Sequence, residues 1–227
     1  MIAANHQPQF LPYLGFFHKV AHSDVLVLLD DVLFMDRHFQ HRNLIKMQTG
    51  TQMLTVPVVK HRGQLIRDVA LAPIPWRRKV WAAIETNYRP APYFAALAPG
   101  LRAILRDGTH ERLVDLDVDL LRWAFEALQI TTAIRIASEL GLPPSEGPNA
   151  HHIAICRAVG AETYLSGPGG KEYMDVTEFE RAGIAIRWQD YRGREYAQLF
   201  PRHGFIPNLA VVDALFNLGP EARSLLA

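Results

Sequence analysis

Hydrophobic and polar positions along the 227-residue chain form two kinds of pattern. Short apolar runs that end at polar or turn residues predict buried strands. Longer stretches with apolar residues three or four positions apart predict amphipathic helices. The predicted strands are residues 1–4, 24–29, 53–59, 66–71, 131–137, 163–165 and 184–188, and the predicted helices are 14–22, 76–88, 93–105, 113–128, 150–159, 176–182 and 209–217.

The order of these elements predicts an α/β fold. Strands and helices alternate at both ends of the chain, which is typical of a mostly parallel, Rossmann-like sheet with helices on both faces. The middle of the chain, residues 76–129, is helical and carries little polar chemistry. We therefore expect a single α/β domain over residues 1–227, with a largely helical insertion or lid at about 76–129.

Composition narrows the function classes. Hydrophobic residues make up 49% and charged residues 21% of the chain, as in an ordinary soluble globular protein. The net charge of +1 favours neither nucleic acid nor an anionic membrane as a partner. The one cysteine fits a reducing compartment, and no stretch reads as a leader or a membrane span. We expect a cytoplasmic protein with no nucleic-acid or membrane partner; a homodimer is left open.

A stiff polar loop follows the first predicted strand. It contains His6, Gln7 and Gln9, whose side chains both donate and accept hydrogen bonds. Pro8 and Pro12 restrict its backbone. Open α/β sheets bind their ligands at the carboxyl ends of strands, so we interpret this loop as functional rather than as a proline-rich turn facing water.

A second loop, Ser166-Gly-Pro-Gly-Gly-Lys171, follows the strand predicted at 163–165. Its glycines allow a ligand to approach the backbone closely, and Lys171 adds a positive charge. The spacing is neither a Walker A motif nor the dinucleotide GxGxxG pattern. From the residues alone, an anion-binding loop and a tight turn that merely needs glycine are equally good interpretations.

Further polar groups follow the second predicted strand. Asp31 lies at its end, and Arg42 and Asn43 lie beyond it; arginine is suited to bidentate binding of carboxylate or phosphate. Arg37 and Lys46, each considered alone, are interpreted as solvated surface charges. Neither of these two is counted in the predicted site.

His152 and Cys156 are four residues apart and so share one face of a predicted helix. The pair could be a nucleophile with its base. Free cysteines are usually buried and inert, and we favour that interpretation. The ten histidines show no metal-ligand spacing, so no metal site is predicted; no cofactor is identified.

The polar stretches resemble the WbqC-like family, which is found in bacteria, often beside genes for surface-glycan or natural-product assembly. The resemblance is carried by His6-Gln-Pro-Gln-Phe-Leu-Pro-Tyr-Leu-Gly-Phe-Phe-His-Lys19, by Arg42-Asn-Leu-Ile-Lys46, by Tyr164-Leu-Ser-Gly-Pro-Gly-Gly-Lys-Glu-Tyr-Met-Asp175 and by the segment 196–219. The family pattern usually places serine near Ala210, so a role for that hydroxyl is in doubt here. Asp213 is interpreted as a first-turn acid favoured by the helix dipole rather than a buried functional acid.

The resemblance implies a transferase of aminoacyl or similar groups that acts on a small-molecule or carrier-bound substrate. His6 would be the general base, since an ordinary histidine pKa of about 6.5 suits proton removal. Lys171 and Arg42 would hold an anionic part of the donor. Two alternatives stay open: a nucleotide-dependent nucleotidyl or adenylyl transferase, and a non-catalytic subunit of a biosynthetic complex.

The two loops should share one cleft if the sheet is parallel, because the ends of its strands meet at one edge. The predicted catalytic residues are His6, Lys171 and Asp31. The predicted substrate-binding residues are Gln7, Gln9, Tyr13, Arg42, Asn43, Ser166, Gly167, Gly169, Gly170, Tyr173 and Gln198.

Overall fold

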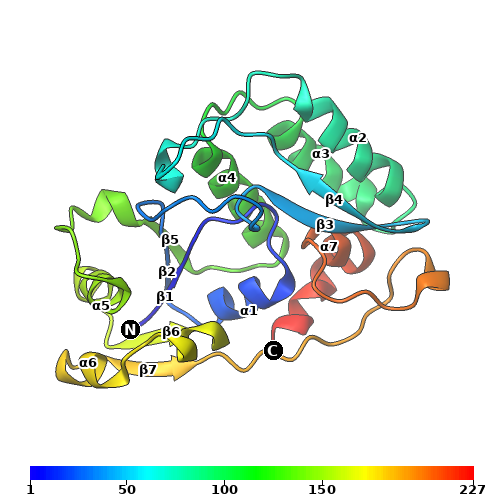
Figure 1. Cartoon of the computed structure of the whole chain (residues 1–227). Coiled ribbons are helices and arrows are strands. Elements are labelled where there is room, and N and C mark those ends of the chain that lie inside the picture. Colours follow the sequence, from blue (N-terminus) through cyan, green and yellow to red (C-terminus); the bar gives the residue numbers. More distant parts are fainter. The chain divides into compact units, whose positions relative to one another are not determined.

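Five parallel strands form the main sheet of this protein, and they come from residues 2–28 and 133–188 (Figure 1). The computed structural model describes residues 1–227. The chain divides into two compact units of three segments each. The sheet unit comprises Met1–Gln7, His18–Val32 and Thr131–Arg192, and the helical unit comprises Pro8–Phe17, Leu33–Ile130 and Gly193–Ala227.

The sheet confirms the predicted parallel α/β class. Its strand order is β5-β2-β1-β6-β7, and every pair of neighbours is parallel. Each predicted strand of this unit is present within a few residues of its expected bounds. The strands are β1 (Ile2–His6), β2 (Val25–Leu28), β5 (Ala133–Ile136), β6 (Thr163–Ser166) and β7 (Ala185–Trp188).

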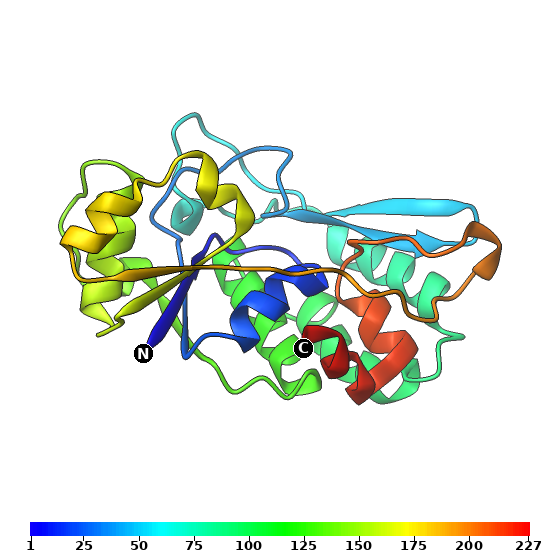
Figure 2. The ribbon, with the colours of Figure 1, turned by 90° about the horizontal axis from the view of Figure 1, so that it is seen from below.

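Helices cover both faces of this sheet. On one face, α5 (Pro148–Ala158) and α6 (Val176–Arg181) lie side by side and pack against alternate strand residues such as Ala3 and Val27 (Figure 2). The last turn of α1 (Leu14–Ala21) lies on the other face (Figure 1). The four residues of β2 are buried in full, as a strand covered on both sides requires.

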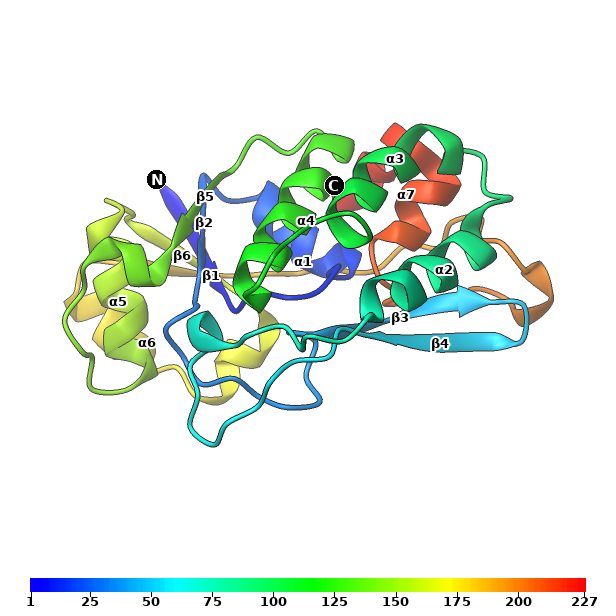
Figure 3. The same ribbon diagram turned by 90° about the horizontal axis from the view of Figure 1, so that it is seen from above.

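The helical unit contains the three helices expected in the middle of the chain. They are α2 (Trp76–Tyr88), α3 (Phe94–Leu105) and α4 (Leu113–Ala127), and α7 (Val212–Leu218) packs with them (Figure 3). Phe216 of α7 is the centre of an aromatic cluster, with ring centroids 5.0 Å from Phe94 and 5.6 Å from Tyr88. None of the helices combines the length and the apolar composition that a membrane crossing requires.

Two predictions for the helical unit are wrong. The strand expected at 53–59 is β4 (Gly50–Thr55), and its partner β3 (Arg42–Met47) was not predicted. The segment 66–71 begins with a 3₁₀ turn, Ile66–Asp68, and only isolated bridges follow it. Charged residues broke the alternation that would have identified β3, and the long-range contacts of Lys46, described below, explain why a lysine fits there.

Asp117 on α4 is fully buried, and neither of its carboxylate oxygens has a hydrogen-bond partner. Burial raises its pKa well above the ordinary value of 3.8. The folded state therefore keeps a proton that the unfolded state releases, and stability falls as pH rises above the ordinary pKa, by up to about 1.4 kcal/mol per pH unit. We expect Asp117→Asn, which cannot ionise, to be more stable than the wild type at neutral pH.

Urea unfolding at a series of pH values measures this effect. The exposed Asp115, on the same helix, provides the control, because its carboxylate is bonded to Arg112 at the surface. Asp115→Asn should keep the pH dependence of the wild type, and Asp117→Asn should flatten it. Parallel curves for all three proteins would show that Asp117 ionises equally in the folded and unfolded states.

Candidate functional site

The strand order places a topological switch point between β1 and β6. Counted within the sheet unit alone, the order is 3-2-1-4-5, and the direction of winding reverses between the central strand and β6. At such a switch point the loops that follow the two strands diverge and leave a crevice at their carboxyl ends. The loops in question are the two that sequence analysis selected.

Strand register brings the two loops together within the sheet unit. Ala3 of β1 pairs with Tyr164 of β6 in parallel. The same register carried two residues further brings Asn5 level with Ser166, and neighbouring strands are about 4.8 Å apart. His6, Gln7, Ser166 and the glycine loop therefore start from one edge of the sheet, as predicted. Five other predicted residues belong to the helical unit: Gln9, Tyr13, Arg42, Asn43 and Gln198. That they contribute to the same site stays a prediction.

His6 is a neutral imidazole with a defined tautomer. Its Nδ1 lies 2.9 Å from the backbone oxygen of Gln7, and because a carbonyl only accepts, Nδ1 carries the hydrogen. The lone pair is then on Nε2. Burial, together with the nearby charge of Lys19, lowers the pKa of His6 to about 3. His6 is therefore unprotonated at neutral pH but a weaker base than its ordinary pKa suggested.

A buried polar cluster lies beside His6, and sequence analysis did not include it. The Lys19 ammonium donates to the backbone oxygen of Asn5 at 3.0 Å, and the Asn5 amide lies 3.1 Å from Nδ1 of His152. Asn5 and Lys19 are only 3% and 4% exposed. Burial lowers the pKa of Lys19 to about 7 and that of His152 to about 4. Lys19 lies three residues after the buried Phe16, and this helical spacing was the available signal.

Asp31, which follows β2, contacts a histidine. One of its carboxylate oxygens is 3.3 Å from Nε2 of His151, on α5. The preceding residue, Asp30, is buried and accepts from the backbone and hydroxyl of Ser138 at 2.9 and 2.6 Å. Asp30 therefore anchors the strand end, whereas Asp31 is the partly exposed carboxylate.

The glycines of the second loop have different structural roles. A Cβ at Gly170 would come within 2.2 Å of the Ser166 hydroxyl, so packing alone requires glycine there. A Cβ at Gly169 would meet nothing within 4 Å, and its backbone conformation is not one that requires glycine. The Lys171 ammonium lies 5.6 Å from the centroid of the Trp188 ring, a cation–π distance. Gly169 thus leaves open space in a loop that carries a cation.

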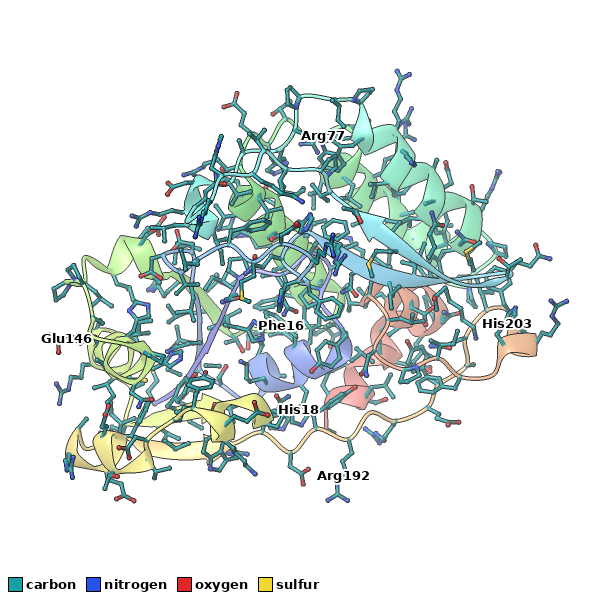
Figure 4. All side chains as sticks on the ribbon, in the orientation of Figure 1. Phe16, His18, Arg77, Glu146, Arg192 and His203 are labelled. Atoms are coloured by element: carbon teal, nitrogen blue, oxygen red, sulfur yellow. The ribbon has the colours of Figure 1, made fainter.

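Gln189 links the start of the glycine-rich loop, at Ser166, to α1. Its backbone N–H donates to the oxygen of Ser166 at 2.8 Å, and its side-chain nitrogen lies 3.0 Å from Nδ1 of His18. His18, labelled in Figure 4, also packs against Tyr191, with ring centroids 5.1 Å apart and the rings tilted by 52°. Burial, with smaller contributions from the charges of His22 and Arg187, lowers the pKa of His18 to about 4. An accepting, neutral imidazole is therefore consistent with this contact.

In the helical unit, Asn43 holds the first loop. It is 2% exposed, and its amide donates to the backbone oxygens of Leu11 and Phe10 at 2.7 and 3.3 Å. Leu11 has a positive φ of 45°, which a leucine adopts only when its surroundings hold it there. Asn43 is therefore a positioning residue for the segment that carries Gln9 and Tyr13.

Gln198 and Lys46 form a buried network in the same unit. Lys46 is fully buried, so its interpretation as a surface charge is wrong; its ammonium donates to Gln198 Oε1 at 3.1 Å and to the oxygen of Gly204 at 2.6 Å. Asp213 is also fully buried and accepts from the hydroxyls of Tyr88 and Tyr196. Asp213 lies in the first turn of α7, as predicted. It is nevertheless a buried acid held by two tyrosine hydroxyls, so its interpretation through the helix dipole alone is wrong.

Cys156 is buried in the core of the sheet unit. Burial raises the pKa of its thiol to about 12, so the reactive thiolate is scarce at neutral pH. His152, its expected base, is bonded to Asn5 instead. The structure therefore supports the inert interpretation. No three His, Cys, Asp or Glu side chains converge to hold a metal ion.

Comparisons with known proteins cover nearly the whole chain. The sequence model of the WbqC-like protein family matches residues 7–225. A Mycobacterium tuberculosis H37Rv protein named "Uncharacterized protein Rv1507c" is 34% identical over 223 residues, which are 97% of this chain and 95% of that protein. No solved structure matches the chain. The similarity therefore includes segments of both units.

Proposed function

Because the chain belongs to the WbqC-like protein family, we propose that it is a group transferase, which moves an aminoacyl or similar acyl group during assembly of a bacterial surface glycan or natural product. The observation that carries this proposal is the strand order. It opens the loop after β1 and the loop after β6 onto one switch point, with a neutral imidazole on one side and a cation on the other.

In this transfer, an amine or hydroxyl of the acceptor attacks the carbonyl carbon of the acyl donor. The nucleophile forms the new bond, and the leaving group departs with its electron pair. His6 Nε2 accepts the hydrogen bond of the attacking group and takes its proton as the bond forms. With a pKa of about 3, His6 does not remove that proton beforehand.

Other residues bind and position the donor. Lys171 holds an anionic part of it, and the open space at Gly169 lets the donor approach the backbone. Asp31 orients His151 at the neighbouring strand end. Asn43 keeps the first loop in place from within the helical unit.

Mass spectrometry of a deletion strain tests the proposal. We expect the strain to accumulate an acceptor that is lighter than the wild-type product by one acyl group, and the wild-type gene to clear it. A strain that accumulates no acceptor, yet loses a complex detected by co-purification, would instead support the non-catalytic subunit.

A nucleotide-dependent transferase is the second candidate, because the 3-2-1-4-5 order is that of nucleotide-binding sheets. Calorimetry with ATP, other nucleoside triphosphates and nucleotide sugars, in the presence of magnesium, tests it. Gly169→Val should weaken any such binding about tenfold or more by filling the open space. Ala185→Val, which adds the same side chain at an exposed position of β7, is the control. Absence of binding to all of these nucleotides would remove this candidate.

A further inference from the structure

The helical unit carries a loop, residues 33–40, whose large apolar side chains face solvent. Leu33, Met35 and Phe39 are 57%, 46% and 49% exposed. Single exposed apolar residues are common on protein surfaces. Three within seven positions of one short loop are a concentration that needs an explanation.

A second segment lies beside this loop and extends the apolar surface. The Phe34 N–H donates to the oxygen of Gln64 at 2.8 Å, and Leu33 forms an antiparallel bridge with Leu65. Val59 at the start of this segment is 37% exposed. The two segments together form what we call the loop patch: Leu33, Met35, Phe39 and Val59 with the exposed basic residues Arg37, Lys60, His61 and Arg62.

Buried and ionic contacts fix the backbone of the loop. Gln40 is 1% exposed, and its side-chain oxygen accepts from the Met35 N–H at 2.9 Å. Asp36 accepts from the Lys60 ammonium at 2.6 Å and from the Arg37 N–H at 2.9 Å. The Gln40 contact links the two ends of the loop, and the contact of Asp36 with Lys60 links its tip to the second segment.

Arg37, at the tip, has a positive φ of 64°, and its backbone oxygen accepts from the Arg42 guanidinium. A non-glycine residue in this conformation is strained unless its surroundings hold it. The loop is thus held in one conformation while its apolar side chains face outward. Surfaces that are ordered before binding lose less conformational entropy on association.

We propose that the loop patch is a docking surface for an acidic, amphipathic segment of a partner protein. The apolar side chains provide contact area, and the basic residues around them select the partner by charge. Asp36 is the only acid within the loop, and Lys60 already pairs with it, which leaves Arg37 and Arg62 to face the partner. This inference is independent of the proposed transferase activity.

Other occupants fit less well. A second copy of the chain would bring the same basic residues to face one another across a two-fold axis. Single-stranded nucleic acid binds on aromatic platforms, whereas three of the four apolar residues are aliphatic. Membrane surfaces bind extended amphipathic helices, and the loop patch contains no helix.

Fluorescence anisotropy with a labelled peptide tests the inference. The probe is an amphipathic helix of about 18 residues with leucine on one face and glutamate on the other. A peptide with lysine in place of each glutamate is its matched control. We expect the acidic peptide to bind the full-length protein at least about tenfold more tightly, with an affinity that falls as salt is added.

Variants locate the binding. Phe39→Ser and Arg62→Glu should each weaken binding of the acidic peptide about tenfold, a typical loss for an interface anchor. Val176→Ser, which changes a 42% exposed valine in the sheet unit, should leave it within about twofold. All three positions are exposed, and unchanged melting temperatures will verify folding.

Each of the following results would overturn the proposal. The acidic peptide does not bind, the lysine peptide binds with the same affinity, or Phe39→Ser binds the acidic peptide as tightly as the wild type does. Self-association of the wild type that Phe39→Ser abolishes would have the same meaning. Binding to anionic lipid vesicles that depends on Phe39 and exceeds peptide binding would also overturn it, in favour of a membrane surface.

Discussion

Replacing His6 by alanine should lower turnover by about 10²- to 10⁴-fold, the usual contribution of a positioned proton acceptor, and leave the melting temperature nearly unchanged. The reason is the tautomer: the Gln7 oxygen accepts the Nδ1 hydrogen, so the lone pair is on Nε2, the atom that we propose takes the proton. Alanine removes that acceptor and keeps the pairing of β1 with β2, because strands pair through their backbones.

The measurement is the rate of acyl transfer once the accumulated acceptor is in hand. His22→Ala is the matched control, since His22 is a partly buried histidine just after α1 whose Nδ1 lies 2.8 Å from the backbone oxygen of His18 and whose ring lies 4.3 Å from the His18 ring. Wild-type kcat/KM should show no inflection near pH 6.5 from His6, because its pKa is lowered to about 3. Full activity in His6→Ala would remove this residue from the mechanism.

Replacing Asp213 by alanine should lower the free energy of unfolding by about 3–5 kcal/mol, the typical cost of removing one partner from a buried charged network. Its two carboxylate oxygens accept from Tyr88 at 2.8 Å and from Tyr196 at 2.7 Å. Alanine leaves both hydroxyls without these partners and removes a carboxyl group that interacts electrostatically with the buried Lys46.

Urea unfolding followed by circular dichroism measures this loss. Asp119→Ala is the control: its side chain is 42% exposed and contacts Arg122 at 3.0 Å and His110 at 2.8 Å, and exposed pairs contribute about 1 kcal/mol or less. A double-mutant cycle with Tyr196→Phe would separate one hydrogen bond from the rest of the network. If Asp213→Ala costs no more than Asp119→Ala, the network does not stabilise the helical unit.

The elements predicted correctly are those whose cause is local. The uninterrupted Val25–Leu28 run is a strand buried on both faces, and the apolar spacing of residues 76–88 gave α2 with the bounds that the structure has. The β3 strand was missed because Lys46 interrupts its alternation. The groups that accept hydrogen bonds from Lys46 belong to Gln198 and Gly204, about 150 residues later in the chain, and no local pattern reveals them.

The residues of the candidate site likewise fall into those that the sequence predicted and those that it did not. The polar loops after β1 and β6 were recognisable because parallel strands bring their ends to one edge. Lys19 lies in the predicted helix 14–22 but was not included in the predicted site, because a lysine in an amphipathic helix is normally exposed. The pKa of His6 depends on burial beside Lys19, and no sequence pattern conveys that.

The division of the chain into interleaved segments constrains both its synthesis and its evolution. The chain passes from one unit to the other after Gln7, Phe17, Val32, Ile130 and Arg192. Ile2 of the central strand β1 pairs with Thr163, about 160 residues later, so this side of the β1 ladder forms only after β6 has been synthesised. Neither unit is one continuous stretch of the chain, so exchanging a single gene fragment would not replace one unit and leave the other intact.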